Sequence, residues 1–98
     1  MMTADRITAG YAEVYKKRTP LLAEAIASAK TDMELLDVVI TETIIIREEL
    51  KKLGSIKHLK PSKRVAVMYL KEKDLYMATM AKACRVLDEA SRILNNLN

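Results

Sequence analysis

Hydrophobic residues recur at helical spacing over three stretches of the chain. In the first stretch, over about residues 3–18, the apolar positions are separated by three or four residues, which places them on one face of a helix. These positions are Ala4, Ile7, Tyr11 and Val14. Three basic residues, Lys16-Lys17-Arg18, follow, and cations favour a helix C-terminus. The pattern therefore predicts a short helix over 3–18.

The second stretch begins at Thr19-Pro20, which has the pattern of an N-cap residue followed by proline at the first helical position. From there apolar residues repeat in steps of four and three, as in a heptad seam: Leu22, Ile26, Ala29, Met33, Leu36 and Ile40. Thr31 and Glu34 also match a capping box, which would start a new helix at Thr31. Because the seam does not slip there, the pattern favours one continuous helix over 20–53.

The third stretch is predicted as a helix over 61–96, opened by Pro61 or Ser62. Gly54 is the residue type that commonly follows a helix C-terminus, so residues 54–60 form a short connection. Two helices of nearly equal length joined by a short turn are typical of an antiparallel hairpin. The sequence thus predicts an all-α fold in a single domain over 1–98: a long hairpin, with the first helix along its open end.

This arrangement also predicts a second subunit. Residues 38–46 are apolar almost all round the helix, which is typical of a helix buried on every side. The short first helix leaves part of the long hairpin uncovered, and exposed apolar stripes of that size usually meet a partner. We therefore expect a homodimer in which the hairpins pack into a larger bundle.

One charged pair interrupts the apolar faces of the predicted hairpin. Glu42 lies between Val39 and Ile46 on an apolar stripe, and Lys73 breaks the seam of the last helix. With the turn centred near Lys57, Glu42 and Lys73 face each other, so we predict that they form one polar layer. Such layers fix helix register at some cost in stability.

Composition agrees with closely packed helices. Half of the 98 residues are hydrophobic, mostly aliphatic, with no Phe or Trp and only two Gly and two Pro. The lone Cys84 excludes an internal disulfide, and no apolar run approaches the roughly 20 residues that cross a bilayer. We expect a cytoplasmic protein without a membrane role. The absence of Gln and the many Lys and Glu residues favour a thermophilic source, such as a thermophile or one of its viruses.

Positive charge is concentrated in one part of the chain. Residues 47–73 hold nine basic and three acidic side chains, a net charge of +6 against +4 for the whole chain. On the hairpin these residues crowd the closed end, where they are candidates for contacting nucleic-acid phosphates. The candidates are Lys51, Lys52, Lys57, His58, Lys60, Lys63 and Arg64. The alternative is a solvated turn whose lysines cap the helix and keep the end soluble. A helix-turn-helix is disfavoured because the connection is too long and the helices too extended.

The sequence carries no recognisable catalytic, metal or cofactor motif. One His and one Cys, 26 residues apart, cannot build a zinc site, and no glycine-rich loop is available to cradle a phosphate. The four tyrosines and the methionines lie at helical spacing, which favours packing over base stacking or a binding groove. We therefore expect a non-enzymatic structural or adaptor protein without cofactor that mediates protein–protein interaction. The alternative is a protein that binds DNA or RNA through its basic end.

Overall fold

The chain forms three α-helices. The computed structural model describes residues 3–97, with side chains described as far as Asn96. Helix α1 spans Ala4–Ser28, α2 spans Asp32–Lys51 and α3 spans Lys63–Leu97. Within residues 3–97 there is no strand, which confirms the all-α prediction. The last helix lies where the sequence predicts it. The first two helices have other bounds than the predicted 3–18 and 20–53.

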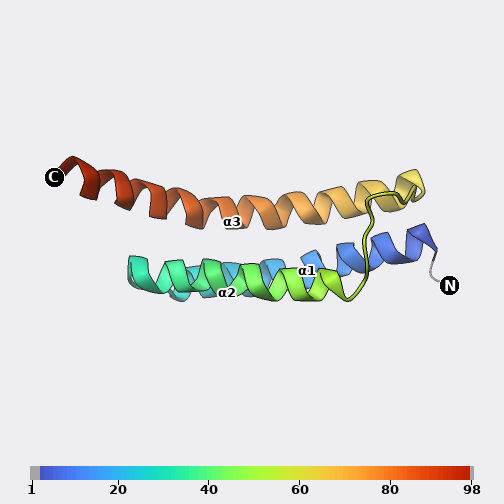
Figure 1. Ribbon diagram of the computed structural model, residues 1–98, viewed down its shortest axis with the longest axis horizontal. Helices are drawn as coiled ribbons and strands as arrows, with labels where there is room; N and C mark the ends of the chain where they lie inside the picture. Colours follow the sequence, from blue (N-terminus) through green and yellow to red (C-terminus); the bar gives the residue numbers. More distant parts are fainter. Residues whose placement is uncertain (1–2, 98) are drawn as a thin grey trace.

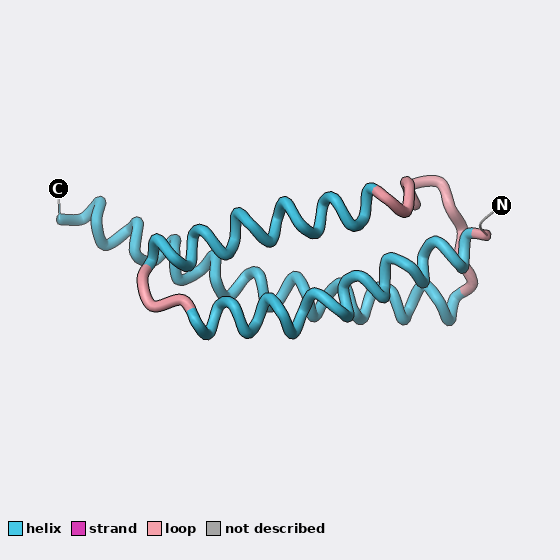
Figure 2. Tube along the Cα trace, turned by 90° about the horizontal axis from the view of Figure 1, so that it is seen from below, coloured by secondary structure: helices cyan, strands magenta, loops and turns pink. Residues whose placement is uncertain are grey.

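The helices form an elongated three-helix bundle that runs up, down and up. Helices α1 and α3 point in the same direction, and α2 runs in the opposite direction (Figure 1). The molecule measures 56 × 19 × 19 Å. The α1–α2 and α2–α3 connections lie at opposite ends, and the C-terminal turns of α3 project beyond the other two helices (Figure 2). Helices α2 and α3 are antiparallel as predicted, but their predicted equal length is wrong, because residues 20–28 belong to α1.

Thr19-Pro20 does not start a helix, contrary to the prediction from sequence. Pro20 lies inside α1, and the Thr19 hydroxyl donates to the Tyr15 carbonyl one turn back at 2.7 Å. Tyr15 and Leu22, on either side of the proline, are both buried in the same core. Their burial keeps the two halves of α1 in line although proline removes a backbone donor. Tertiary packing thus overrides the local signal at this position.

The helix predicted to be continuous over 20–53 breaks before Thr31. Thr31 is the N-cap of α2, and its hydroxyl accepts from the Glu34 amide at 3.1 Å. The Glu34 carboxylate reaches back and accepts from the Lys30 amide at 2.7 Å. These reciprocal bonds closely follow the capping-box pattern. The three-residue connection 29–31 preserves the spacing of apolar residues, so the seam conceals the turn.

At the other end of the bundle, a glycine follows the C-terminus of α2. Gly54 has a φ of +87°, the left-handed conformation that favours glycine after a helix. The Tyr11 hydroxyl of α1 donates to the Gly54 carbonyl. The Ser62 amide donates to the Asp5 carboxylate at 2.6 Å, just before α3 begins. Both ends of the α2–α3 connection are therefore tied to the first turns of α1.

The hydrophobic core is thin and lies along the middle of the bundle. Tyr15, Leu22 and Tyr76 are its buried centre, and Tyr69 and Met80 pack against it from α3. The rings of Tyr15 and Tyr76 lie 5.2 Å apart, within the range of favourable aromatic contacts. These positions confirm the expectation that the tyrosines of this region serve packing.

Helix α2 presents a different face to the core than its heptad seam predicts. Leu35 and Glu42 are buried, whereas Met33, Leu36 and Ile40 of the predicted seam are exposed. Val38, Ile46 and Leu50 are the α2 residues that pack on the core. The apolar residues around α2 thus divide into a buried face and an uncovered one.

The break at Thr31 gives a direct test of the three-helix arrangement. We expect Thr31→Ala to lower the free energy of unfolding by about 1 kcal/mol, because the α2 N-cap is lost. Thr43→Ala is the matched control: Thr43 is an exposed residue within α2, where alanine is the better helix former. Urea denaturation followed by circular dichroism measures both. If Thr31→Ala stabilised the protein, the break at Thr31 would be contradicted and a continuous helix over 20–53 would be favoured.

Candidate functional site

The predicted basic residues gather at one end of the bundle. Lys51 ends α2, Lys63 and Arg64 begin α3, and the connection between the two helices supplies the others. This end also holds the first turns of α1 (Figure 1). All seven predicted phosphate-contacting side chains are exposed: Lys51, Lys52, Lys57, His58, Lys60, Lys63 and Arg64. The structure therefore brings this set together, as the sequence led us to expect.

Few of these cations are neutralised. The Lys52 ammonium lies 3.6 Å from the Glu49 carboxylate, and both side chains are well exposed, so this pair is weak. In the part of the chain that the structure describes, no other member of the set forms an ion pair. Lys63 and Arg64 also lie at the N-terminal turn of α3, where the helix dipole disfavours cations. Helix stability alone does not explain positive charge at this position.

A shallow pocket of about 230 Å³ lies beside the basic end. Its wall is almost entirely apolar and is formed by α1, the α2–α3 connection and α3. The lining residues are Thr8, Ile56, Leu59, Pro61, Ala66, Tyr69 and Leu70. The Thr8 hydroxyl is buried there without a hydrogen-bond partner among the described residues.

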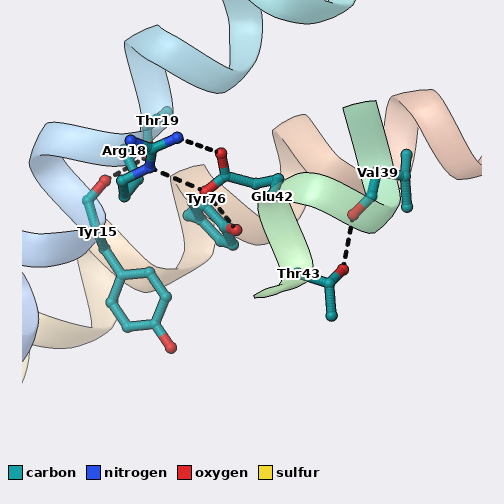
Figure 3. A network of polar contacts seen from close by, with 7 residues as sticks. All are labelled: Tyr15, Arg18, Thr19, Val39, Glu42, Thr43 and Tyr76. Carbon is teal, nitrogen blue, oxygen red and sulfur yellow. Dashed lines mark hydrogen bonds and ion pairs between the residues drawn. The ribbon is translucent and has the colours of Figure 1, made fainter. Parts of the chain in front are cut away.

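The second polar cluster is buried in the middle of the bundle. Only 4% of Glu42 is exposed, and its carboxylate receives three hydrogen bonds (Figure 3). Arg18 of α1 donates from Nη2 to Oε1 at 2.6 Å and from Nε to Oε2 at 3.1 Å. The Tyr76 hydroxyl of α3 donates to Oε2 at 3.1 Å. One carboxylate from α2 therefore joins all three helices.

This cluster corrects the predicted partner of Glu42. Glu42 does belong to a polar layer, but its cation is Arg18, because α1 runs alongside α2 at this level. Lys73 instead lies over the ring of Tyr69, with its ammonium 5.7 Å from the ring centroid, as in a cation–π contact. The short first helix of the sequence analysis left Arg18 too far away to be considered.

The cluster changes the acidity of its members. Burial, and then the Glu42 charge, raise the pKa of Tyr76 well above its usual value near 10. The hydrogen bond to Glu42 likewise raises the pKa of Arg18. Arg18 thus remains a cation and Tyr76 a neutral donor throughout the neutral pH range. Arg18 and Tyr76 therefore both keep their protons near neutral pH.

Arg18 differs in its surroundings from Lys16 and Lys17, its neighbours in the sequence. Lys16, Lys17 and Arg18 lie in the middle of α1 and so do not compensate a helix C-terminus. Lys16 and Lys17 are exposed, whereas Arg18 turns inward to Glu42. The prediction that these three residues end the first helix is therefore wrong.

Residues 3–97 are the part of the chain that the structure describes. Nowhere in this range do three or more His, Cys, Asp or Glu side chains come together as a group that would hold a metal ion. None of the three helices is both long enough and apolar enough to cross a membrane. Cys84 is a free thiol of intermediate exposure.

Comparison of the chain with protein-family models, with curated proteins and with solved structures gives no match.

The buried cluster makes a prediction for stability. Arg18→Met leaves the Glu42 carboxylate buried without its cation, so we expect it to cost about 3 kcal/mol of unfolding free energy. The double variant Arg18→Met with Glu42→Leu removes the uncompensated charge and should recover most of that loss. Arg92→Met is the control, since its pair with Glu89 is exposed and should contribute little. Urea denaturation of the native protein and the three variants measures these differences. Equal losses of unfolding free energy in Arg18→Met and Arg92→Met would contradict the role given to the buried cluster.

Proposed function

We propose that this protein is a non-enzymatic structural or adaptor protein that works as a homodimeric helical bundle and mediates protein–protein interaction. The observation that carries the proposal is the amount of apolar surface that one copy leaves uncovered. Large hydrophobic side chains of all three helices are exposed. Examples are Leu21 of α1, Ile40 and Ile44 of α2, and Leu75 and Ile93 of α3.

The total surface area supports the same proposal. One copy exposes 7315 Å². A compact monomer of 11.1 kDa would expose about 5,700 Å². The radius of gyration is 16.2 Å, against about 13 Å for a compact chain of this length. The excess of roughly 1,600 Å² exceeds the ~800 Å² that each partner contributes to a standard interface.

The chemistry of the side chains is consistent with a role in assembly. The buried charges of Arg18 and Glu42 are hydrogen-bonded to each other, so they tie helices together. The single cysteine suits a reducing compartment, and we place the assembly in the cytoplasm. In this proposal the adaptor faces are those exposed apolar positions that the dimer does not use.

Sedimentation velocity tests the proposed assembly. We expect the full chain to sediment as a dimer at micromolar concentration and to dissociate on dilution, with secondary structure unchanged by circular dichroism. The thin core predicts that the unfolding midpoint rises with protein concentration, because dimerisation stabilises the folded state. A chain that remains monomeric up to hundreds of micromolar, with a concentration-independent midpoint, would contradict the proposal.

A second candidate function is binding of DNA or RNA through the basic end. The exposed, largely unpaired cations at this end favour it, and Lys63 and Arg64 lie where they oppose the α3 dipole. Lysines placed in this way would contact phosphates without reading sequence. The competing interpretation is a solvated turn that keeps the end of the bundle soluble.

Fluorescence anisotropy separates these two interpretations. If the basic end binds phosphate, labelled duplex DNA or single-stranded RNA should bind, with an affinity that falls steeply with salt. Replacing Lys57, Lys60, Lys63 and Arg64 with Ala should abolish binding and preserve helicity. The matched control, which removes the same charge elsewhere, replaces Lys16, Lys17, Lys82 and Arg85 with Ala. Equal loss in both variants, or no binding at low salt, would count against the basic end as the site.

A further inference from the structure

The outward face of α2 carries apolar side chains where a surface helix should present polar ones. Four large apolar side chains lie on the side opposite the buried Leu35 and Glu42. They are Met33, Leu36, Ile40 and Ile44, with exposed fractions of 74%, 40%, 51% and 59%. Their spacing of three, four and four residues keeps them in one stripe. A helix on the surface of a monomer normally carries polar residues there.

The charges beside this stripe suit an antiparallel pair of identical helices. Asp37 borders the N-terminal half of the stripe, and Arg47 continues its C-terminal half. Both side chains are exposed, and neither forms an ion pair among the described residues. When two copies of α2 lie antiparallel about the level of residue 42, Asp37 of each helix faces Arg47 of the other. Such self-complementarity is what a two-fold interface requires.

The basic end of the bundle also favours the antiparallel orientation. It lies at the C-terminal end of α2, where residues 47–73 carry a net charge of +6. A parallel pair of α2 helices would place two such ends side by side, with mutual repulsion. The antiparallel pair places them at opposite ends of the assembly, where separation and salt reduce that repulsion.

We propose that a second copy of this chain covers this stripe, with the two α2 helices antiparallel about a two-fold axis near the level of residue 42. In this register Ile40 packs against Ile44 of the partner subunit, and Asp37 lies beside Arg47 of the partner subunit. The inference rests on the proposed dimeric function and adds to it the surface, the orientation and the register. The exposed apolar side chains of α1 and α3 stay free for other partners.

A charged residue placed in the apolar stripe of α2 tests whether this stripe is the dimer surface. We expect Ile40→Glu to weaken the dimer at least about tenfold in sedimentation equilibrium, because it places two carboxylates beside the axis. Glutamate is a better helix former than isoleucine, so α2 should stay folded, which circular dichroism checks. Val67→Glu is the matched control, since Val67 is 58% exposed on α3. It should leave the dimer unchanged.

The register is tested by reversing charges. Asp37→Arg alone, or Arg47→Asp alone, should weaken the dimer about fivefold through like-charge contacts, and the double variant should restore it. A dimer that survives Ile40→Glu would overturn the proposed surface and leave the dimeric function standing. Failure of the double variant to recover would overturn the register. A native chain that is monomeric throughout would overturn both this inference and the proposed function.

Discussion

The carboxylate of Glu42 fixes how the three helices fit together. It is almost fully buried, and it is held by the Arg18 guanidinium from α1 and the Tyr76 hydroxyl from α3. A buried ion pair adds little net stability, but an unpaired buried charge is very costly. Any rotation or shift of α2 that removed Glu42 from Arg18 would leave such a charge behind. The cluster therefore selects one register among the many that an aliphatic core of similar side chains would accept.

The surface of the protein follows from that selection. Because Glu42 must face inward, Leu35, Val38 and Ile46 face inward with it. The isoleucines on the other side of α2, Ile40 and Ile44, are then directed outward. The buried polar cluster and the exposed apolar stripe are two consequences of one orientation. The orientation of α2 that forms the internal ion pair thus also exposes the surface of the proposed dimer.

The sequence predicts the helical class and the last helix, because apolar periodicity and the residues near Ser62 agree there. It also places the basic residues at one end, since the α2–α3 connection is local in the chain. It fails at Pro20, where burial of Tyr15 and Leu22 outweighs a local helix-start signal, and packing of that kind is not visible in a pattern. It fails at Thr31 for the opposite reason, because a capping signal that was present competed with an apparently unbroken seam.

The polar cluster shows why side-chain partners are harder to predict than helices. Glu42 was recognisable as a charge on an apolar stripe, but its partner depends on which helix lies beside it. Once α1 extends to Ser28, Arg18 comes alongside α2 and replaces Lys73 as the cation. The same error of chain division placed Met33, Leu36 and Ile40 in the core. The capping signal at Thr31 was the cue for dividing the chain there.

The most direct test of this account is an isotope-filtered NOE spectrum of a mixed sample, in which half of the chains carry labelled isoleucine methyl groups and half are unlabelled. The filter reports only contacts between different copies. We expect intermolecular NOEs between the methyl groups of Ile40 and Ile44, across the two-fold axis of the α2 pair. Intermolecular NOEs confined to α1 or α3, or none at millimolar concentration, would contradict the claim that a second copy covers α2.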